Sequence, residues 1–105
     1  HDHVVTMHGM FQVDRKVHIV LDYLAGGDLH THLVRLTRFL EAAAANTIRN
    51  VLSAVDYLQR QQICHRDLKL ENLVLKEPIV YSEDPDGQFY ERLANVVLVD
   101  FGMAT

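Results

Sequence analysis

The first part of the chain has the alternating pattern of short antiparallel strands. Residues 4–13 and 17–23 are rich in β-branched and aromatic side chains, and the second run places Ile19 and Leu21 on one face of a period-two strand. The polar residues 14–16 separate the two runs. This pattern predicts a β-hairpin with its turn at residues 14–16.

After the hairpin, the apolar residues follow a helical period. The glycine pair 26–27 ends the strand pattern, and Asp28 is a good N-cap for a helix predicted over residues 29–36, where leucines are four and three residues apart. A longer helix is predicted over residues 41–61, which contain a run of four alanines. The apolar stripe of this helix consists of Ile48, Val51, Leu52, Val55 and Leu58.

The last third of the chain alternates polar loops with short apolar runs. A polar stretch at 65–73 leads into a predicted strand at 73–75, and a second strand is predicted at 96–99. Residues 76–95 between the strands are turn-like and acidic, with the run EDPD at 83–86. The order of hairpin, two helices, polar loop and two short strands predicts an α+β fold.

Composition is that of one folded domain, with 105 residues of which 49% are apolar. The net charge of −4 argues against a nucleic-acid partner, which favours a basic face, and no apolar run reaches the roughly 18 residues that a membrane span needs. The single cysteine, Cys64, cannot form an internal disulfide. We expect a packed thiol there and an intracellular location, in the cytoplasm or the nucleus.

Residues 65–73 read HRDLKLENL. Most of these side chains are ionisable, and Asn72 carries an amide. Such density suits neither a core helix nor a core strand. With the DFG triplet at 100–102 after a predicted strand, this motif resembles the catalytic and magnesium loops of eukaryotic protein kinases. The long helix before the motif and the strand, glycine pair and helix at 17–33 are also in the order of that family.

The resemblance covers residues 1–105 and implies a partial two-lobed kinase fold of the α+β class. By this likeness, residues 1–24 end the small β lobe and form the hinge, and residues 25–105 begin the helical large lobe. The separation between Asn72 and Asp100 is longer than the family usually needs. We therefore expect a surface insertion at about residues 79–94.

Four polar residues of the two motifs are the candidates for phosphoryl transfer, which depends on positioning and on neutralising charge. By resemblance, Asp67 orients the attacking hydroxyl or accepts its proton, and Lys69 offers a positive charge to the transferred phosphoryl group. Asn72 and Asp100 carry hard oxygen ligands that suit Mg²⁺. Lysine at position 69 resembles the serine/threonine class, which implies ATP and Mg²⁺ as cofactors and protein serine or threonine hydroxyls as substrates. The sequence KLEN at residues 69–72 is similar to that of the calcium/calmodulin-dependent-kinase-like group.

The adenine pocket can also be placed by resemblance. Leu21 would be the gatekeeper, and the segment from Asp22 to Leu24 would be the hinge whose peptide groups read the adenine edge. Asp28 would bind the ribose hydroxyls or, alternatively, cap the helix that follows it. Val74 would form the floor under the adenine or, alternatively, pack as an ordinary strand residue.

Other features of the family pattern are missing from this sequence. No G-x-G-x-x-G loop and no clamp lysine occur, and the activation segment would lie beyond residue 105. The sequence therefore predicts an inactive middle segment of an active kinase, or alternatively a kinase-like binding or decoy module. We expect His65 to pack against Phe101 and Met7 rather than to take part in chemistry. We also expect the apolar stripe of the helix at 41–61 to be partly uncovered.

Overall fold

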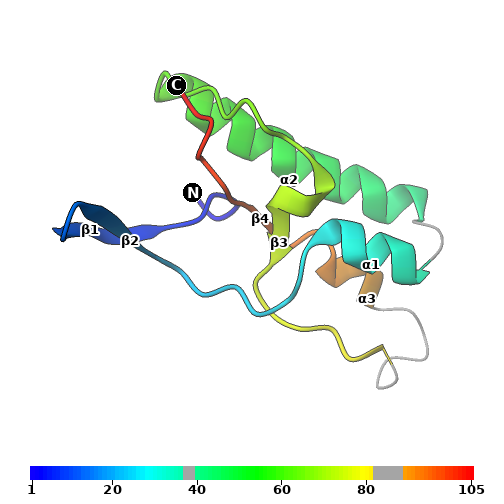
Figure 1. Cartoon of the computed structure of the whole chain (residues 1–105). Helices are drawn as coiled ribbons and strands as arrows, with labels where there is room; N and C mark the ends of the chain where they lie inside the picture. The colour runs from blue at the N-terminus through cyan, green and yellow to red at the C-terminus, as the bar shows by residue number, and fades with distance from the viewer. Residues whose placement is uncertain (37–39, 82–88) are drawn as a thin grey trace.

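The computed structural model describes residues 1–36, 40–81 and 89–105, and it has the mixed α+β content that the sequence predicts. Its elements are β1 (Met7–Val13), β2 (Lys16–Leu21), α1 (Leu29–Leu36), α2 (Glu41–Arg60), the 3-10 turn η1 (Leu70–Asn72), β3 (Leu73–Leu75), α3 (Phe89–Arg92) and β4 (Val96–Leu98) (Figure 1). β1 pairs with β2, and β3 pairs with β4, so the strands form two separate antiparallel sheets.

The predicted hairpin is present as β1 and β2. Its turn consists of Asp14 and Arg15, whose φ angles of 50° and 67° are those of a two-residue turn that matches the strand twist. The apolar face that the pattern predicts is not covered, because Ile19 and Leu21 remain 56% and 46% exposed. The hairpin projects away from the helices, which explains this exposure (Figure 1).

The core lies where α1 and α2 meet the sheet of β3 and β4. β4 is buried along its whole length, which is the reason that its sequence is an unbroken apolar run. The helices supply one leucine each to the cluster, and the segment before β4 adds Leu93. The core residues are Leu29, Leu58, Leu73, Leu75, Leu93, Val96 and Leu98.

The long helix α2 buries a face that only partly overlaps the predicted apolar stripe, with Leu58 in both and Val51 of the stripe partly buried against the core. Ala43, Thr47 and Ala54 are buried together with Leu58, and the Thr47 hydroxyl donates a hydrogen bond to the Ala43 carbonyl at 2.9 Å. Ile48 and Leu52 are 55% and 61% exposed. The expectation of a partly uncovered stripe is therefore confirmed. Small side chains form the buried face because they let the helix approach the sheet closely.

The structure bears on the expectations for Cys64, for the acidic run at 83–86 and for membrane spans. Cys64 is exposed rather than packed, because it lies in the extended segment after α2, where its backbone pairs with that of Thr105. The acidic run at 83–86 lies outside the described residues. Helix α3 (Phe89–Arg92), which follows it, was not predicted. Within the described ranges, no helix is long and apolar enough to cross a membrane.

The C-terminal end of α2 is closed by two backbone hydrogen bonds. The Ile63 N–H donates to the Leu58 carbonyl at 2.9 Å, and the Gln62 N–H donates to the Gln59 carbonyl at 2.9 Å. These are the two bonds of a Schellman cap, which requires a left-handed residue at Gln62. Gln62 has a φ of 60°, a conformation that glycine adopts without the steric cost of a side chain.

Replacing Gln62 by glycine should therefore raise the free energy of unfolding by about 0.5–1 kcal/mol. Denaturant titration followed by circular dichroism measures this change. Gln62→Ala is the matched control, because alanine keeps the steric conflict of a Cβ atom, and it should leave stability nearly unchanged. A glycine variant no more stable than the alanine variant would contradict this account of the helix end.

Candidate active site

The polar motif begins with His65, which connects the loop at 65–69 to the end of β4. His65 is buried, and its Nδ1 accepts a hydrogen bond from the Asp67 N–H at 3.1 Å. Its ring proton is therefore on Nε2, which donates to the Val99 carbonyl at 2.8 Å. The ring also packs edge-on against Phe101, with centroids 4.8 Å apart. The expected packing on Phe101 is confirmed, but the two hydrogen bonds were not predicted.

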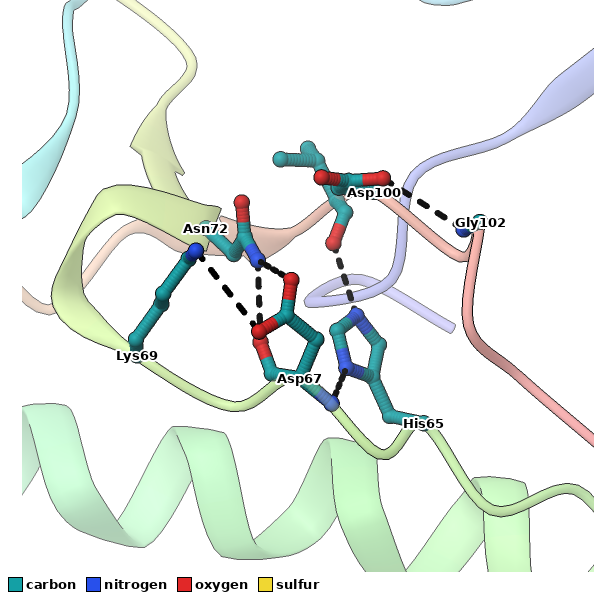
Figure 2. A network of polar contacts seen from close by, with 7 residues as sticks. His65, Asp67, Lys69, Asn72, Asp100 and Gly102 are labelled. Atoms are coloured by element: carbon teal, nitrogen blue, oxygen red, sulfur yellow. Dashed lines mark hydrogen bonds and ion pairs between the residues drawn. The ribbon is translucent and has the colours of Figure 1, made fainter.

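Asp67, Lys69 and Asn72 are in direct contact (Figure 2). The Asn72 amide nitrogen donates to the Asp67 carbonyl at 2.9 Å and to its Oδ2 at 3.1 Å, and the Lys69 ammonium lies 3.6 Å from Oδ1. η1 produces this arrangement because its turn brings residue 72 back over residue 67. Both carboxylate oxygens of Asp67 are thus held by neighbours, which fixes the orientation of the carboxylate.

The pairing of β3 with β4 brings Asp100 back to this loop. Leu73 pairs with Leu98, and the ladder continues with a bond of 3.0 Å from the Val99 N–H to the Asn72 carbonyl. Asp100 therefore follows Val99, whose N–H is bonded to Asn72 and whose carbonyl is bonded to His65. One of its carboxylate oxygens accepts a bond from the Gly102 N–H at 3.3 Å (Figure 2).

Two residues with left-handed backbones flank this site. Arg66 has a φ of 69° and Asp100 has a φ of 60°, which is uncommon for residues with a Cβ atom. Such conformations cost on the order of 1–3 kcal/mol each and persist where surrounding contacts fix them. The hydrogen bonds of His65 are those contacts here, because they hold the peptides next to both strained residues.

The side chains of Asn72 and Asp100 carry oxygen ligands of the type that Mg²⁺ prefers, and their role as its ligands stays a prediction. The Asn72 amide nitrogen faces Asp67, so its side-chain oxygen points away from that carboxylate (Figure 2). Mg²⁺ takes one or two protein oxygens and fills its remaining positions with water and phosphate oxygens. Among the described residues, no group of three or more His, Cys, Asp or Glu could hold a metal, so a protein-only metal cage is not formed there.

Comparison with known proteins identifies the family. The model of the protein kinase domain matches residues 1–105. The chain belongs to the protein kinase family. It is 37% identical over 101 residues to ribosomal protein S6 kinase alpha-4 of Homo sapiens, and equally to that of Mus musculus. The matched region is 96% of this chain but 11% of each relative.

These matches confirm the predicted membership in the kinase family and its α+β fold, and they support the serine/threonine type. Kinases of this family transfer a phosphoryl group, and they generally use ATP and Mg²⁺. The narrower likeness to the calcium/calmodulin-dependent-kinase-like group stays a prediction.

Three of the five predicted adenine residues line two different cavities, and Asp28 and Val74 line neither of them. Leu21 lines an apolar cavity of about 810 Å³ together with Met7 and Phe101, at the base of the hairpin. Asp22 and Leu24 line a second cavity of about 290 Å³. Asp22 is bonded to His8, and this hydrogen bond lowers the pKa of its carboxyl group. Their roles in nucleotide binding stay predictions.

Asp28 caps α1, which is one of the two roles that the sequence leaves open. Its carboxylate accepts hydrogen bonds from the Thr31 N–H at 3.1 Å and from the Thr31 hydroxyl at 2.6 Å. These bonds lower the pKa of the Asp28 carboxyl group. Its backbone forms an isolated bridge to Val74, which is partly buried and pairs with Val97 in β4. Asp28 and Val74 therefore lie side by side, and their roles in nucleotide binding stay predictions.

Replacing Asp28 by alanine should reduce the free energy of unfolding by about 1 kcal/mol at neutral pH, because the helix loses its N-cap. The pKa of this carboxyl group is lower in the folded than in the unfolded chain. Its contribution is therefore fully present above the unfolded pKa and is lost as the pH falls through the folded one. Denaturation curves between pH 2 and 7 should show the two proteins converging at low pH. Asp28→Asn, which keeps an acceptor, should lose less, and an alanine variant as stable as the wild type at pH 7 would contradict the capping role.

Proposed function

We propose that this chain forms the phosphoryl-transfer centre of a serine/threonine protein kinase. The observation that carries the proposal is the contact of Asp67 with Lys69 and Asn72, at the place to which the β3–β4 pair returns Asp100. A carboxylate, an ammonium group and two oxygen ligands are among the groups that transfer from ATP to a hydroxyl requires. The chain matches only 11% of the length of each relative. The kinase activity of the whole protein is therefore also proposed.

Asp67 is proposed to orient the hydroxyl of the protein substrate and to accept its proton during transfer. Its side chain is 26% exposed, so a hydroxyl can reach it from solvent. The contacts from Asn72 and Lys69 hold the carboxylate in one orientation, which favours a productive angle of approach. The oxygen of the substrate then bonds to the γ-phosphorus as the bond to the β-phosphate oxygen breaks, and ADP leaves.

Lys69 is proposed to contact the phosphoryl oxygens during this transfer. Its ammonium group lies 3.6 Å from Asp67 and is about half exposed, so it can reach a group that approaches the same carboxylate. A positive charge placed there stabilises the charge on the transferred group. The lysine also supports serine and threonine as acceptors, because it is the residue typical of that class.

Asn72 and Asp100 are proposed to hold Mg²⁺ against the phosphates of ATP. The ion would neutralise charge on the phosphate oxygens and fix their position. The hydrogen bond from Asn72 to Asp67 would couple the two tasks, since the amide nitrogen faces the proposed catalytic carboxylate and the amide oxygen would be left to hold the metal.

The adenine is proposed to bind between the segment 22–24 and Val74, with Leu21 at the inner end. The bridge between Asp28 and Val74 supports this placement, because it joins the end of the linker to the proposed floor of the pocket. Each oxygen of the Asp28 carboxylate can accept more than one hydrogen bond, so the capping bonds to Thr31 are compatible with a bond to the ribose.

We also infer the division into lobes and the cellular location. The projecting hairpin supports assigning residues 1–24 to a small lobe and hinge, and the core supports assigning residues 25–105 to a large lobe. The long separation of Asn72 from Asp100 supports an insertion at about 79–94, although Leu93 of that range is buried in the core. The free Cys64 supports an intracellular protein, and the net charge of −4 supports protein substrates over nucleic acid.

In the complete protein, Asp67→Asn should lower kcat by about 10²- to 10⁴-fold, because the acceptor of the proton is lost, and it should leave the Kd for ATP within about twofold. Transfer of labelled γ-phosphate to serine and threonine peptides measures kcat. Glu71→Gln is the matched control in the same loop and should retain activity. Undiminished transfer by the Asp67 variant would overturn its assigned role. A wild-type protein that binds ATP without transferring phosphate would overturn the enzymatic proposal.

A further inference from the structure

A second group of connected polar side chains lies on the other side of the core, around His32 of α1. His32 is buried and uses both ring nitrogens. Its Nε2 is bonded to the Gly26 carbonyl at 2.6 Å, and its Nδ1 is bonded to the Tyr81 hydroxyl. A carbonyl can only accept, so the proton is on Nε2, and Nδ1 of the neutral ring accepts a bond from the Tyr81 hydroxyl. His32 thus joins α1 to the linker just before it and to Tyr81, which is 49 residues further along the chain.

The first of these segments is the linker at residues 25–27, which continues from the proposed hinge. The Gly26 N–H donates to the Leu75 carbonyl at 2.9 Å, and the Leu75 N–H donates to the Gly27 carbonyl at 3.0 Å. A Cβ atom added to Gly26 would lie 2.4 Å from the Glu77 carbonyl oxygen and 2.5 Å from the Leu75 side chain. The linker is therefore packed against the end of β3, and His32 holds it there from the other side.

The second segment contains Tyr81, which belongs to the region predicted as an insertion. Its ring packs edge-on against Phe89 with centroids 4.8 Å apart, and the guanidinium of Arg35 lies 4.5 Å from its centroid. Burial raises the pKa of the Tyr81 hydroxyl, so the group remains a donor at neutral pH. Aromatic and cation–π contacts of this kind fix the ring. Tyr81 is thereby placed to hold the ring of His32 in one orientation.

We propose that His32 and Tyr81 are positioning residues for the nucleotide, and that Tyr81 sets the affinity for ATP by holding the linker 25–27 through His32. This inference rests on the proposed function, because it assumes that the segment 22–24 reads the adenine. The chain of contacts runs from the Tyr81 hydroxyl to the imidazole, from the imidazole to the Gly26 carbonyl, and along the backbone to Leu24. Among the hydrogen bonds of the described residues, none joins Tyr81, His32 or Gly26 to Asp67, Lys69, Asn72 or Asp100.

The contacts of Tyr81 and His32 raise the fraction of molecules in which the linker 25–27 is held in the position that binds ATP. Without the Tyr81 hydroxyl, Nδ1 of His32 loses its donor inside a buried environment, and conformations in which the ring and the linker move away become more populated. The apparent Kd for ATP rises in inverse proportion to the fraction that remains competent to bind. The rate of transfer from bound ATP depends on Asp67 and Lys69, so it should not change.

The test is Tyr81→Phe in the complete protein, which removes one hydroxyl and keeps the ring on Arg35 and Phe89. We expect the KM and the directly measured Kd for ATP to rise about fivefold, with kcat within about twofold of the wild type. Thr47→Val on α2 is the matched control, because it also removes a buried hydroxyl that makes a hydrogen bond, and it should leave all three values unchanged. In a His32→Leu background, Tyr81→Phe should raise the Kd by less than twofold, because the connection is already broken.

An unchanged Kd for ATP in Tyr81→Phe, with a thermal unfolding temperature equal to that of the wild type, would overturn the proposal. A fall in kcat without a change in the Kd would also overturn it, because Tyr81 would then act on the transfer centre. The direct measurement of ATP binding separates this inference from the proposed function. If no variant transfers phosphate but the Kd still rises fivefold, the positioning role stands and the enzymatic proposal fails.

Discussion

The candidate site depends on the antiparallel pairing of β3 with β4 and on its continuation past the strands. The bond between the Val99 N–H and the Asn72 carbonyl extends the ladder by one step, and the bond from His65 to the Val99 carbonyl ties the same peptide to the polar loop. These two bonds fix the position of Val99 and therefore of Asp100, the next residue along the chain. They also fix the backbone on either side of two left-handed residues, which places the candidate metal ligands next to the candidate base.

The polar networks around His65 and His32 both contact this sheet, but we propose different roles for them. His65 lies at the carboxyl end of β4 and orders the backbone of the proposed transfer centre, whereas His32 lies beside the carboxyl end of β3 and is bonded to the linker. In both networks, a buried imidazole uses each nitrogen once, and a backbone carbonyl determines which nitrogen carries the proton. A buried histidine with two partners is rigid, and rigidity is what a residue that positions backbone has to provide.

Elements that depend on local pattern were predicted well from the sequence, and contacts that depend on the tertiary fold were not. The hairpin, α1, α2 and both short strands follow from periodicity and turn residues, and the motif at 65–72 together with DFG indicated the residues that meet in the site. The buried face of α2 was missed because Ala54 and Thr47 carry no strong apolar signal. The bonds from His65 to Val99 and from His32 to Tyr81 span 34 and 49 residues, and a sequence pattern holds no information on such partners.

Density for a metal in the complete protein would test the central claim most directly. A crystal of that protein with Mn²⁺ in place of Mg²⁺ and a non-hydrolysable ATP analogue should give an anomalous peak about 2 Å from both the Asn72 side-chain oxygen and the Asp100 carboxylate, with the γ-phosphate facing Asp67 and Lys69. The bound ion would show that the β3–β4 pair builds one site. A peak distant from either ligand, with nucleotide present, would contradict the account.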